Sequence, residues 1–330
     1  LEREIDALGF KRALVLSTPE QRDSAEMVAN LLGARAAGVF DRAVMHVPIE
    51  TAREAREIAR QLGADCAVAI GGGSTTGLGK AIALDSGLPI IAIPTTYAGS
   101  EMTPVYGITE GGMKKTGKDV RVVPRCVIYD PELTLGLPVN MSVTSGINAI
   151  AHSAEGLYAP DRNPVISFMA REGIAALGRA LPAIRQQPTD LAARTDAFYG
   201  AWLCGIVMGS VGMALHHKLC HTLGGTFNLP HAECHTVMLP HALAYNAAAA
   251  PEAMQQIAAA LGGPSAAGAV FDLARDNGAA VALRDIGMRE QDLDKACDIA
   301  VQNQYPNPRA LDRTALRALF QDAFEGRRPG

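Results

Sequence analysis

The chain has 330 residues, and 48% of them are hydrophobic, which is enough to build a full core without disulfides or structural metals. The formal net charge is −4 at pH 7, and charged residues of both signs are scattered rather than gathered in blocks. Such a chain presents no basic field to nucleic acid, so the sequence favours a small-molecule ligand.

The six cysteines lie far apart and form no CxxC pair, which is typical of reduced thiols in the cytoplasm. We find no uncharged apolar stretch of the ~18 to 20 residues that a membrane helix needs, and "LEREIDALGFKR" does not resemble a signal peptide. We therefore expect a cytoplasmic protein with no membrane partner. The first residue is Leu rather than Met, so we expect a further N-terminal segment to precede it.

Short β-rich runs alternate with helical patterns over the first 135 residues. Strands are expected at 12–17, 36–41, 65–70, 88–93 and 125–130, and helices at about 19–32, 50–62 and from 74. This alternation predicts a parallel sheet with helices on both faces, an α/β dinucleotide-binding domain. The segment 107–119 carries turn residues and little apolar content, which predicts a surface hairpin or loop.

The sequence pattern changes near residue 137, where β-rich runs end and Ala- and Leu-rich segments with helical periodicity begin. We expect an all-helical second domain, so that the chain divides into 1–138 and 139–330. The alanine-rich stretch 242–281 keeps helical spacing and is interpreted as packed helices rather than low complexity.

A glycine loop follows the third expected strand, at Gly71, Gly72, Gly73 and Ser74. Glycines allow backbone N–H groups to approach a diphosphate closely, and a helix N-terminus adds partial positive charge. The loop does not match GxGxxG and does not follow the first strand, so the ordinary Rossmann fingerprint fails. A tight strand-to-helix turn is the alternative interpretation.

The next strand ends in "PTTYAGSEMTP", residues 94–104. Thr95, Thr96 and Ser100 can bond phosphate or ribose, because ligands of open α/β sheets bind at the carboxyl edge. Ordinary loop capping is the alternative. Tyr97 is a candidate for substrate or nicotinamide contact, with packing an equal alternative.

The first expected strand is followed by Ser17 and Thr18 rather than by an acidic residue. An acidic side chain there would bind the adenosine ribose and repel a 2′-phosphate, whereas hydroxyls tolerate both cofactors. We expect NADH and NADPH to be used without strong discrimination.

Six of the eight histidines lie between residues 213 and 241. His217 and His221 are four residues apart, as are Asn148 and His152, so each pair shares a helix face. His231 follows a turn that would return it toward His217. Imidazoles serve as metal ligands and as proton carriers, and their gathering predicts a catalytic cleft between the domains.

Packing is the alternative for each histidine taken alone. We assign a packing role to the remaining three histidines of segment 213–241, His216, His235 and His241. Lys218 lies beside the cluster and is a candidate for a substrate carboxylate, although a solvated lysine is the simpler interpretation.

Four motifs in this order, "GGGS", "PTTYAGSE", "NAIAH" and "HHKLCHTLGGTFNLPH", resemble the iron-containing (group III) alcohol dehydrogenase superfamily. The resemblance implies the dehydroquinate-synthase-like architecture, an NAD(P)-binding α/β domain followed by a helical one. It also implies a divalent-metal site of Asp-x-x-x-His and two histidines fourteen residues apart. The corresponding positions here are Asn148, His152, His217 and His231.

The departure from the superfamily pattern is Asn148, which stands where a carboxylate is usual. An amide is neutral and a weaker donor, so metal affinity should fall and we expect no metal. Three neutral imidazoles can still bind zinc, so loss of the ion is expected but not obligatory.

Within the superfamily, "SGINAIAHSAEGLYAPDRNP" and "YPNPRALDRTALRALF" resemble the maleylacetate reductase family. That resemblance implies NADH- or NADPH-dependent reduction of the C=C bond of maleylacetate to 3-oxoadipate, in the degradation of aromatic compounds, by a homodimer. It makes His152, His217, His221, His231 and Asn148 the expected catalytic residues.

Three rival functions stay open. A metal-dependent alcohol or polyol dehydrogenase of the same fold would bind zinc or iron despite Asn148. A dehydroquinate-synthase-like lyase would need a basic phosphate-binding set, which the motifs do not contain. A non-enzymatic nucleotide-binding sensor would show no turnover.

Overall fold

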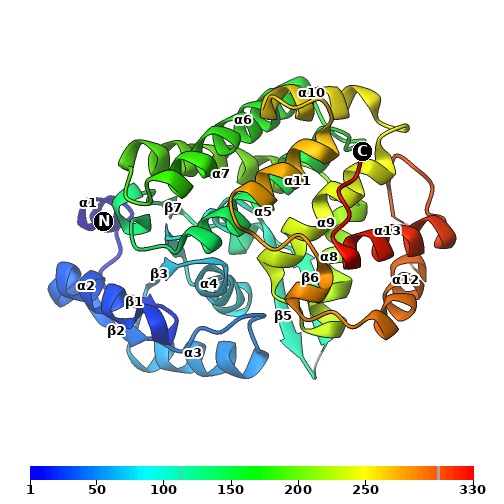
Figure 1. Ribbon diagram of the computed structural model, residues 1–330. Helices are drawn as coiled ribbons and strands as arrows, with labels where there is room; N and C mark the ends of the chain where they lie inside the picture. The colour runs from blue at the N-terminus through cyan, green and yellow to red at the C-terminus, as the bar shows by residue number, and fades with distance from the viewer. Residues whose placement is uncertain (112, 303–304) are drawn as a thin grey trace. The chain divides into compact units, whose positions relative to one another are not determined.

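The computed structural model describes residues 1–111, 113–302 and 305–330, in two compact units, Leu1–Thr134 and Leu135–Gly330. The boundary placed after residue 138 from the sequence falls just inside the second unit. Each unit has its own hydrophobic core. The helices and strands of both units are labelled in Figure 1.

A five-stranded parallel sheet forms the centre of the first unit. Its strands are β1 (Ala13–Leu16), β2 (Ala36–Phe40), β3 (Cys66–Gly71), β4 (Ile90–Pro94) and β7 (Cys126–Val127). They lie in the order β2-β1-β3-β4-β7, so the strand order reverses between β1 and β3. In open α/β sheets this reversal opens a crevice at the carboxyl ends of the two strands.

Helices cover both faces of the sheet, as the alternation of elements predicts. Alternate side chains of β1 and β3 pack on α1 (Glu2–Ala7) and α2 (Arg22–Leu32) on one face. The intervening side chains pack on α3 (Ile49–Gln61) and α4 (Gly73–Ser86) on the other. Both faces are therefore buried, which explains why the strands are continuous apolar runs.

The polar segment after β4 forms an antiparallel pair, β5 (Val105–Glu110) with β6 (Met113–Lys118). The expectation of a surface hairpin is confirmed there, apart from residue 112, which lies outside the described residues.

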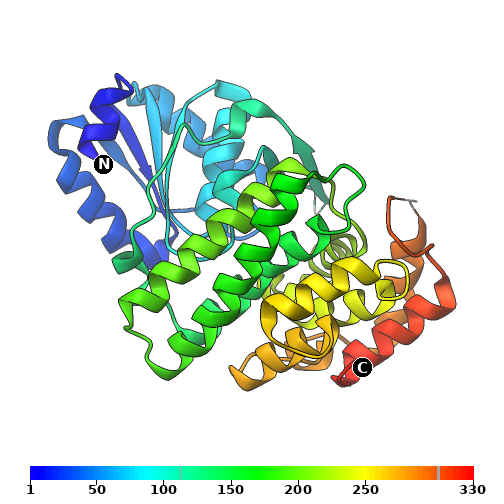
Figure 2. The ribbon, with the colours of Figure 1, turned by 90° about the horizontal axis from the view of Figure 1, so that it is seen from above.

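The second unit is helical throughout the residues described. Its helices are α5 (Val139–Gly156), α6 (Pro164–Gln186), α7 (Leu191–Ser210), α8 (Leu215–Phe227), α9 (His231–Asn246), α10 (Pro251–Leu261), α11 (Ala266–Asp276), α12 (Leu293–Gln302) and α13 (Arg313–Glu325). The predicted fold class, an α/β half followed by an all-α half, is confirmed. The long helices α6 and α7 run side by side, as Figure 2 shows.

Helix α5 is central to this unit, because almost every side chain from Ser142 to Gly156 is buried. A helix that is buried on all sides needs apolar or small residues on every face, which its sequence supplies. The largest polar side chains within it, those of Asn148, His152 and Glu155, therefore require partners or a function.

The stretch 251–276 has the length and apolar composition of a membrane span. The structure breaks it at Gly262, which has φ +69°, into two helices of 11 residues each. At 1.5 Å per residue neither helix reaches across a hydrocarbon core of about 30 Å.

Candidate active site

The glycine loop follows β3, one of the two strands between which the strand order reverses. Gly71 has φ +150°, and a Cβ on it would lie 2.5 Å from Thr75 Oγ1. A Cβ on Gly72 would lie 3.0 Å from Thr96 Cγ2. The loop therefore needs residues without a Cβ where it passes Thr75 of α4 and Thr96 of the loop after β4.

The N-terminus of α4 is open toward the same loop. The helix begins at Gly73 with Gly72 as its N-cap, and no side chain of the described residues caps it. Ser17 Oγ, directly after β1, and Thr75 Oγ1, in the first turn of α4, are buried and have no hydrogen-bond partner among the described residues. Uncapped N–H groups and unpaired hydroxyls are what a phosphate group requires.

Hydrogen bonds tie the loops of this edge together. Gln21 Nε2 donates to Thr95 Oγ1 at 2.8 Å, and Thr95 N–H donates to the Gly71 carbonyl at 3.1 Å. The structure thus brings together the segments after β1, β3 and β4 that contain Thr18, Ser74 and Thr96.

Two further predicted residues of the first unit, Tyr97 and Ser100, make hydrogen bonds that hold the segment after β4 in place. Tyr97 is fully buried, and its hydroxyl donates to Thr134 Oγ1 at 3.4 Å, which is the packing alternative. Ser100 offers its carbonyl to Lys80 Nζ at 2.6 Å. Lys80 also donates to the carbonyls of Thr103 and Val105, so this lysine holds the chain between β4 and β5.

Six histidines of the second unit form one cluster on α5, α8 and α9, namely His152, His216, His217, His221, His231 and His235. The ring centroids of His152 and His217 are 5.2 Å apart, and those of His217 and His235 are 4.9 Å apart. His231 joins through His235, at 4.5 Å. Three helices therefore bring together the imidazoles that spacing predicted, with His216 and His235 added.

Burial lowers the pKa of three histidines of this cluster. Desolvation lowers the pKa of His152 well below its usual value, and the neighbouring His217 and His231 lower it further. Desolvation also lowers the pKa of His216 and His235, again with contributions from neighbouring histidines. Mutual repulsion of this kind limits how many protons the cluster can hold.

His221 and Lys218 lie on α8 away from the centre of the cluster. The His221 ring is exposed and 6.4 Å from His217. Lys218 is half-buried, and its Nζ lies 5.5 Å from the centroid of the Tyr305 ring.

Sequence reasoning missed Glu155, which is fully buried below His217. Its Oε2 lies 2.8 Å from His217 Nδ1. The available signal was a lone acidic residue three positions after His152 in an otherwise uncharged helical segment.

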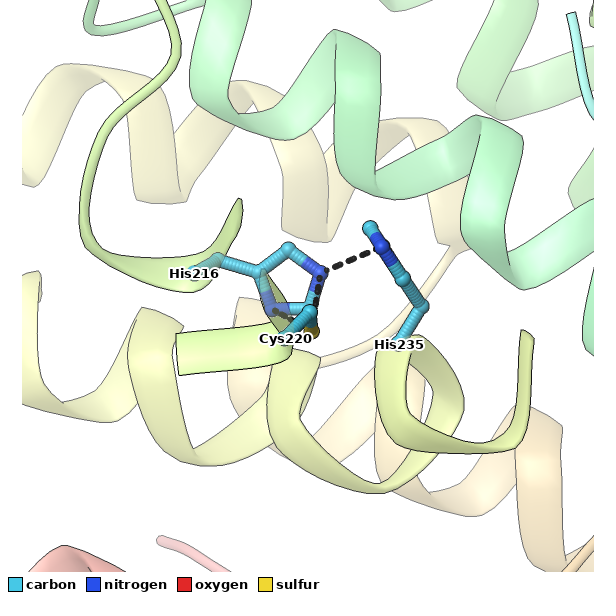
Figure 3. Close-up of side chains that lie close together, drawn as sticks. All are labelled: His216, Cys220 and His235. Atoms are coloured by element: carbon cyan, nitrogen blue, oxygen red, sulfur yellow. Dashed lines mark hydrogen bonds between the residues drawn. The ribbon is translucent and has the colours of Figure 1, made fainter. Parts of the chain in front are cut away.

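His216 and His235, assigned to packing from the sequence, lie against each other within the cluster. Figure 3 shows the bond between His216 Nε2 and His235 Nδ1, which is 2.9 Å long. Cys220 completes a set of possible ligand atoms within 4.8 Å of one another. However, its Sγ lies 3.7 and 4.0 Å from the two His216 nitrogens, beside the ring rather than along one lone pair.

Cys220 also suits a metal poorly for an electrostatic reason. Burial raises the pKa of its thiol well above the usual value, and thiolate is the form that binds metals. We interpret the set as a hydrogen-bonded histidine pair packed on a thiol.

A second set has the character of metal ligands. Asn148 Oδ1, His152 Nδ1 and His217 Nε2 are buried and have no hydrogen-bond partner within the described residues. A carboxylate behind a ligating imidazole, as Glu155 lies behind His217, is the usual support of a metal-bound histidine. An amide oxygen and imidazole nitrogens are donor types that divalent ions accept, but these groups are all neutral and none offsets the charge of an ion.

Family models match almost the whole chain. The model "Iron-containing alcohol dehydrogenase" matches residues 1–131, and "Fe-containing alcohol dehydrogenase family, C-terminal" matches residues 142–324.

Individual proteins match over the full length. The maleylacetate reductase of Burkholderia cepacia is 67% identical over 329 residues, which cover 100% of this chain and 94% of that protein. The crystal structure of maleylacetate reductase from Agrobacterium tumefaciens has a TM-score of 0.96 and 56% identity, covering 99% of this chain and 93% of that one. A structure from Ralstonia eutropha, described as an alcohol dehydrogenase, has a TM-score of 0.99 and 66% identity, covering 100% and 94%.

Proposed function

The chain belongs to the iron-containing alcohol dehydrogenase family, and we propose that within this family it reduces the C=C bond of maleylacetate with NADH or NADPH. The product is 3-oxoadipate, and the reaction belongs to the degradation of aromatic compounds. The observation that carries the proposal is 67% identity to a maleylacetate reductase across the full length of this chain.

The reaction is a conjugate hydride addition. Hydride leaves the nicotinamide and bonds to the alkene carbon β to the ketone, and the alkene electrons move toward the ketone oxygen as an enolate. A proton then bonds to the carbon next to the ketone, so that one NAD(P)H and one proton are consumed. The protein must therefore stabilise an oxyanion and supply a proton.

The histidine cluster suits both tasks. We assign oxyanion stabilisation and proton supply to His152, His217 and His231, with His221 and Asn148 at the edge of the same set. A well-aimed hydrogen-bond donor contributes about 3 kcal/mol to such a transition state. Unpaired, buried atoms of Asn148, His152 and His217 are consistent with groups that await a substrate.

We assign the cofactor to the carboxyl edge of the sheet. The diphosphate would bind the loop of Gly71, Gly72, Gly73 and Ser74, where α4 has no side-chain cap. Thr95, Thr96 and Ser100 follow β4 at the same edge. Ser17 and Thr18 carry no charge to exclude a 2′-phosphate, so both cofactors should be accepted.

A divalent ion held by Asn148, His152, His217 and His231 would polarise the substrate's ketone oxygen. We propose that the reduction does not depend on it, because an amide replaces the charged ligand and hydrogen-bond donors can stabilise the same oxyanion. We further propose Lys218 as a partner for one substrate carboxylate, and Tyr97 as a support of the cofactor loop.

The test uses protein dialysed against EDTA, mixed with maleylacetate and either NADH or NADPH. Absorbance at the nicotinamide band reports turnover, and elemental analysis reports zinc and iron. We expect turnover with both cofactors at negligible metal content. Turnover that returns only with added metal would contradict the proposal that the reduction is independent of metal. Absence of turnover both with and without metal would contradict the reductase function.

We also propose that the enzyme is a cytoplasmic homodimer. All six cysteines are free thiols in the structure, as a reducing compartment requires. Light scattering on a size-exclusion column should give twice the chain mass.

A further inference from the structure

We propose that Glu155 is a positioning residue for the proposed reduction. Its carboxylate fixes the ring orientation and the tautomer of His217, and so reserves Nε2 of that imidazole for the substrate. The inference rests on the proposed function for its catalytic consequence, but its structural core can be tested without any turnover.

The contacts of Glu155 leave little freedom to its carboxylate. Oε2 accepts from the backbone N–H of Ala214 at 2.7 Å and lies 2.8 Å from His217 Nδ1. Oε1 accepts from the backbone N–H of His216 at 2.7 Å and from the Tyr158 hydroxyl at 3.4 Å. Each carboxylate oxygen is thus bound to a backbone amide and a side chain.

These amides belong to the N-terminus of α8, whose N-cap is Ala214. A helix N-terminus favours a negative charge, and the two short backbone bonds are those of a charge-assisted acceptor. Backbone N–H and hydroxyl donors already face both oxygens, so the carboxylate acts toward His217 as a hydrogen-bond acceptor.

The tautomer of His217 follows from this chemistry. Facing an acceptor-only group, Nδ1 must carry a hydrogen and donate it to Glu155 Oε2. In the neutral ring, Nε2 then carries the lone pair, and Nε2 is the atom that is buried without a hydrogen-bond partner among the described residues. His217 must therefore take up a solvent proton at Nε2 before it can donate there to the substrate, and the Glu155 carboxylate stabilises the protonated ring, as an acidic residue does for the histidine of catalytic triads.

A capping role alone would not need the contact with His217. Asp190 offers a comparison, because it accepts from the backbone N–H of Ala192 and Ala193 at the start of α7 and has no histidine partner. Asp190→Asn therefore removes a helix-terminal carboxylate without touching the cluster, and serves as the matched control.

The test variant is Glu155→Gln, which keeps the size of the side chain. An amide NH₂ at the Oε2 position would face the Ala214 N–H and would donate to His217 Nδ1, which favours the opposite tautomer. We expect kcat for maleylacetate to fall by roughly 10²- to 10³-fold, with KM changed less than about threefold, because an uncharged amide neither fixes Nδ1–H nor stabilises the protonated ring, which impairs the chemical step rather than binding. Glu155→Asp should recover part of kcat.

The decisive readout is ¹⁵N NMR of the metal-free protein labelled at its histidine rings, with His217→Asn used to assign the signals. The native protein should show His217 protonated at Nδ1 and bare at Nε2. Glu155→Gln should shift the population toward Nε2–H, and Asp190→Asn should change neither the tautomer nor kcat.

Two results would overturn the inference. One is a native His217 with its hydrogen on Nε2, which needs no variant to observe. The other is a Glu155→Gln protein with the reversed tautomer and native kcat. If native protein does not turn over maleylacetate, the proposed function fails instead, and the NMR measurement still decides the role of Glu155 toward His217.

Discussion

Asn148 is the residue at which the chain departs from the metal-binding pattern that it resembles. Its Oδ1 is buried and unpartnered among the described residues, in the same helix as His152. The position therefore offers an oxygen donor of the right kind but without charge. A single carboxylate there would combine with the imidazoles in a ligand set that offsets a divalent ion.

We predict that Asn148→Asp raises zinc affinity by roughly 10- to 100-fold, a size typical of changes to the surroundings of a metal site. Competition with a chromophoric chelator measures the affinity, and elemental analysis after dialysis measures the retained metal. Asn148→Ala, which removes the oxygen donor, is the control and should not gain affinity. Equal affinity in the Asp and native proteins would mean that the four side chains do not form a metal site.

The missed residues show what spacing can and cannot predict. His231 and His235 are four residues apart on α9, so the same rule that paired His217 with His221 could have placed His235 in the cluster. Glu155 could not have been assigned to His217 in this way. Their contact joins α5 to α8 across 62 positions of sequence, and helical periodicity carries no information on which helices face each other.

At the scale of the element, the turn from β3 into α4 determines the cofactor site. The usual fingerprint fails because it expects the glycines after the first strand, whereas here the strand order reverses between β1 and β3. The carboxyl end of β3 borders the crevice equally well. The strands themselves were predictable because continuous apolar runs mark strands buried on both faces.

We predict that Gly71→Ala weakens NADH binding by at least about tenfold. Gly71 has φ +150°, and the added Cβ would displace Thr75 or Gln21 from the loop. Quenching or enhancement of NADH fluorescence on titration gives the dissociation constant.

Gly87→Ala is the matched control for that measurement. Gly87 ends the same helix with φ +70°, and a Cβ there meets nothing within 4 Å. The Gly87→Ala substitution should lower the free energy of unfolding by about 1 kcal/mol, because alanine disfavours the left-handed backbone, and it should leave the NADH affinity unchanged. A Gly71→Ala protein with native affinity would remove the loop from the cofactor site.

At the scale of the whole molecule, the change of sequence pattern near residue 137 predicted a division into two units. The structure divides at residue 134, because the 3-10 turn at Pro131–Thr134 packs with the first unit. Local patterns locate such a boundary only within a few residues, since they do not show which core a connecting turn joins.

The cores of both units carry few charges, and the second unit buries several histidines in their neutral form. Desolvation lowers the pKa of His152, His216 and His235 within the cluster. It also lowers the pKa of His241, on α9, to about 4, although Asp322 opposes this shift. Because the unfolded chain binds protons to these rings at a higher pH than the folded chain does, acid must favour unfolding.

We predict that the free energy of unfolding falls as pH decreases from about 6.5 toward 4. For His241 the folded pKa of about 4 lies below the usual histidine pKa of 6.5. The contribution of neutral His241 to the free energy of unfolding is fully present above pH 6.5. About 2 kcal/mol of that contribution is lost between pH 7 and pH 5. Urea unfolding followed by Trp202, the chain's single tryptophan and part of α7, reports the second unit. His241→Gln cannot titrate, so its unfolding free energy should fall by about 2 kcal/mol less over the same interval. An equal fall in both proteins would show that His241 is not held neutral by burial.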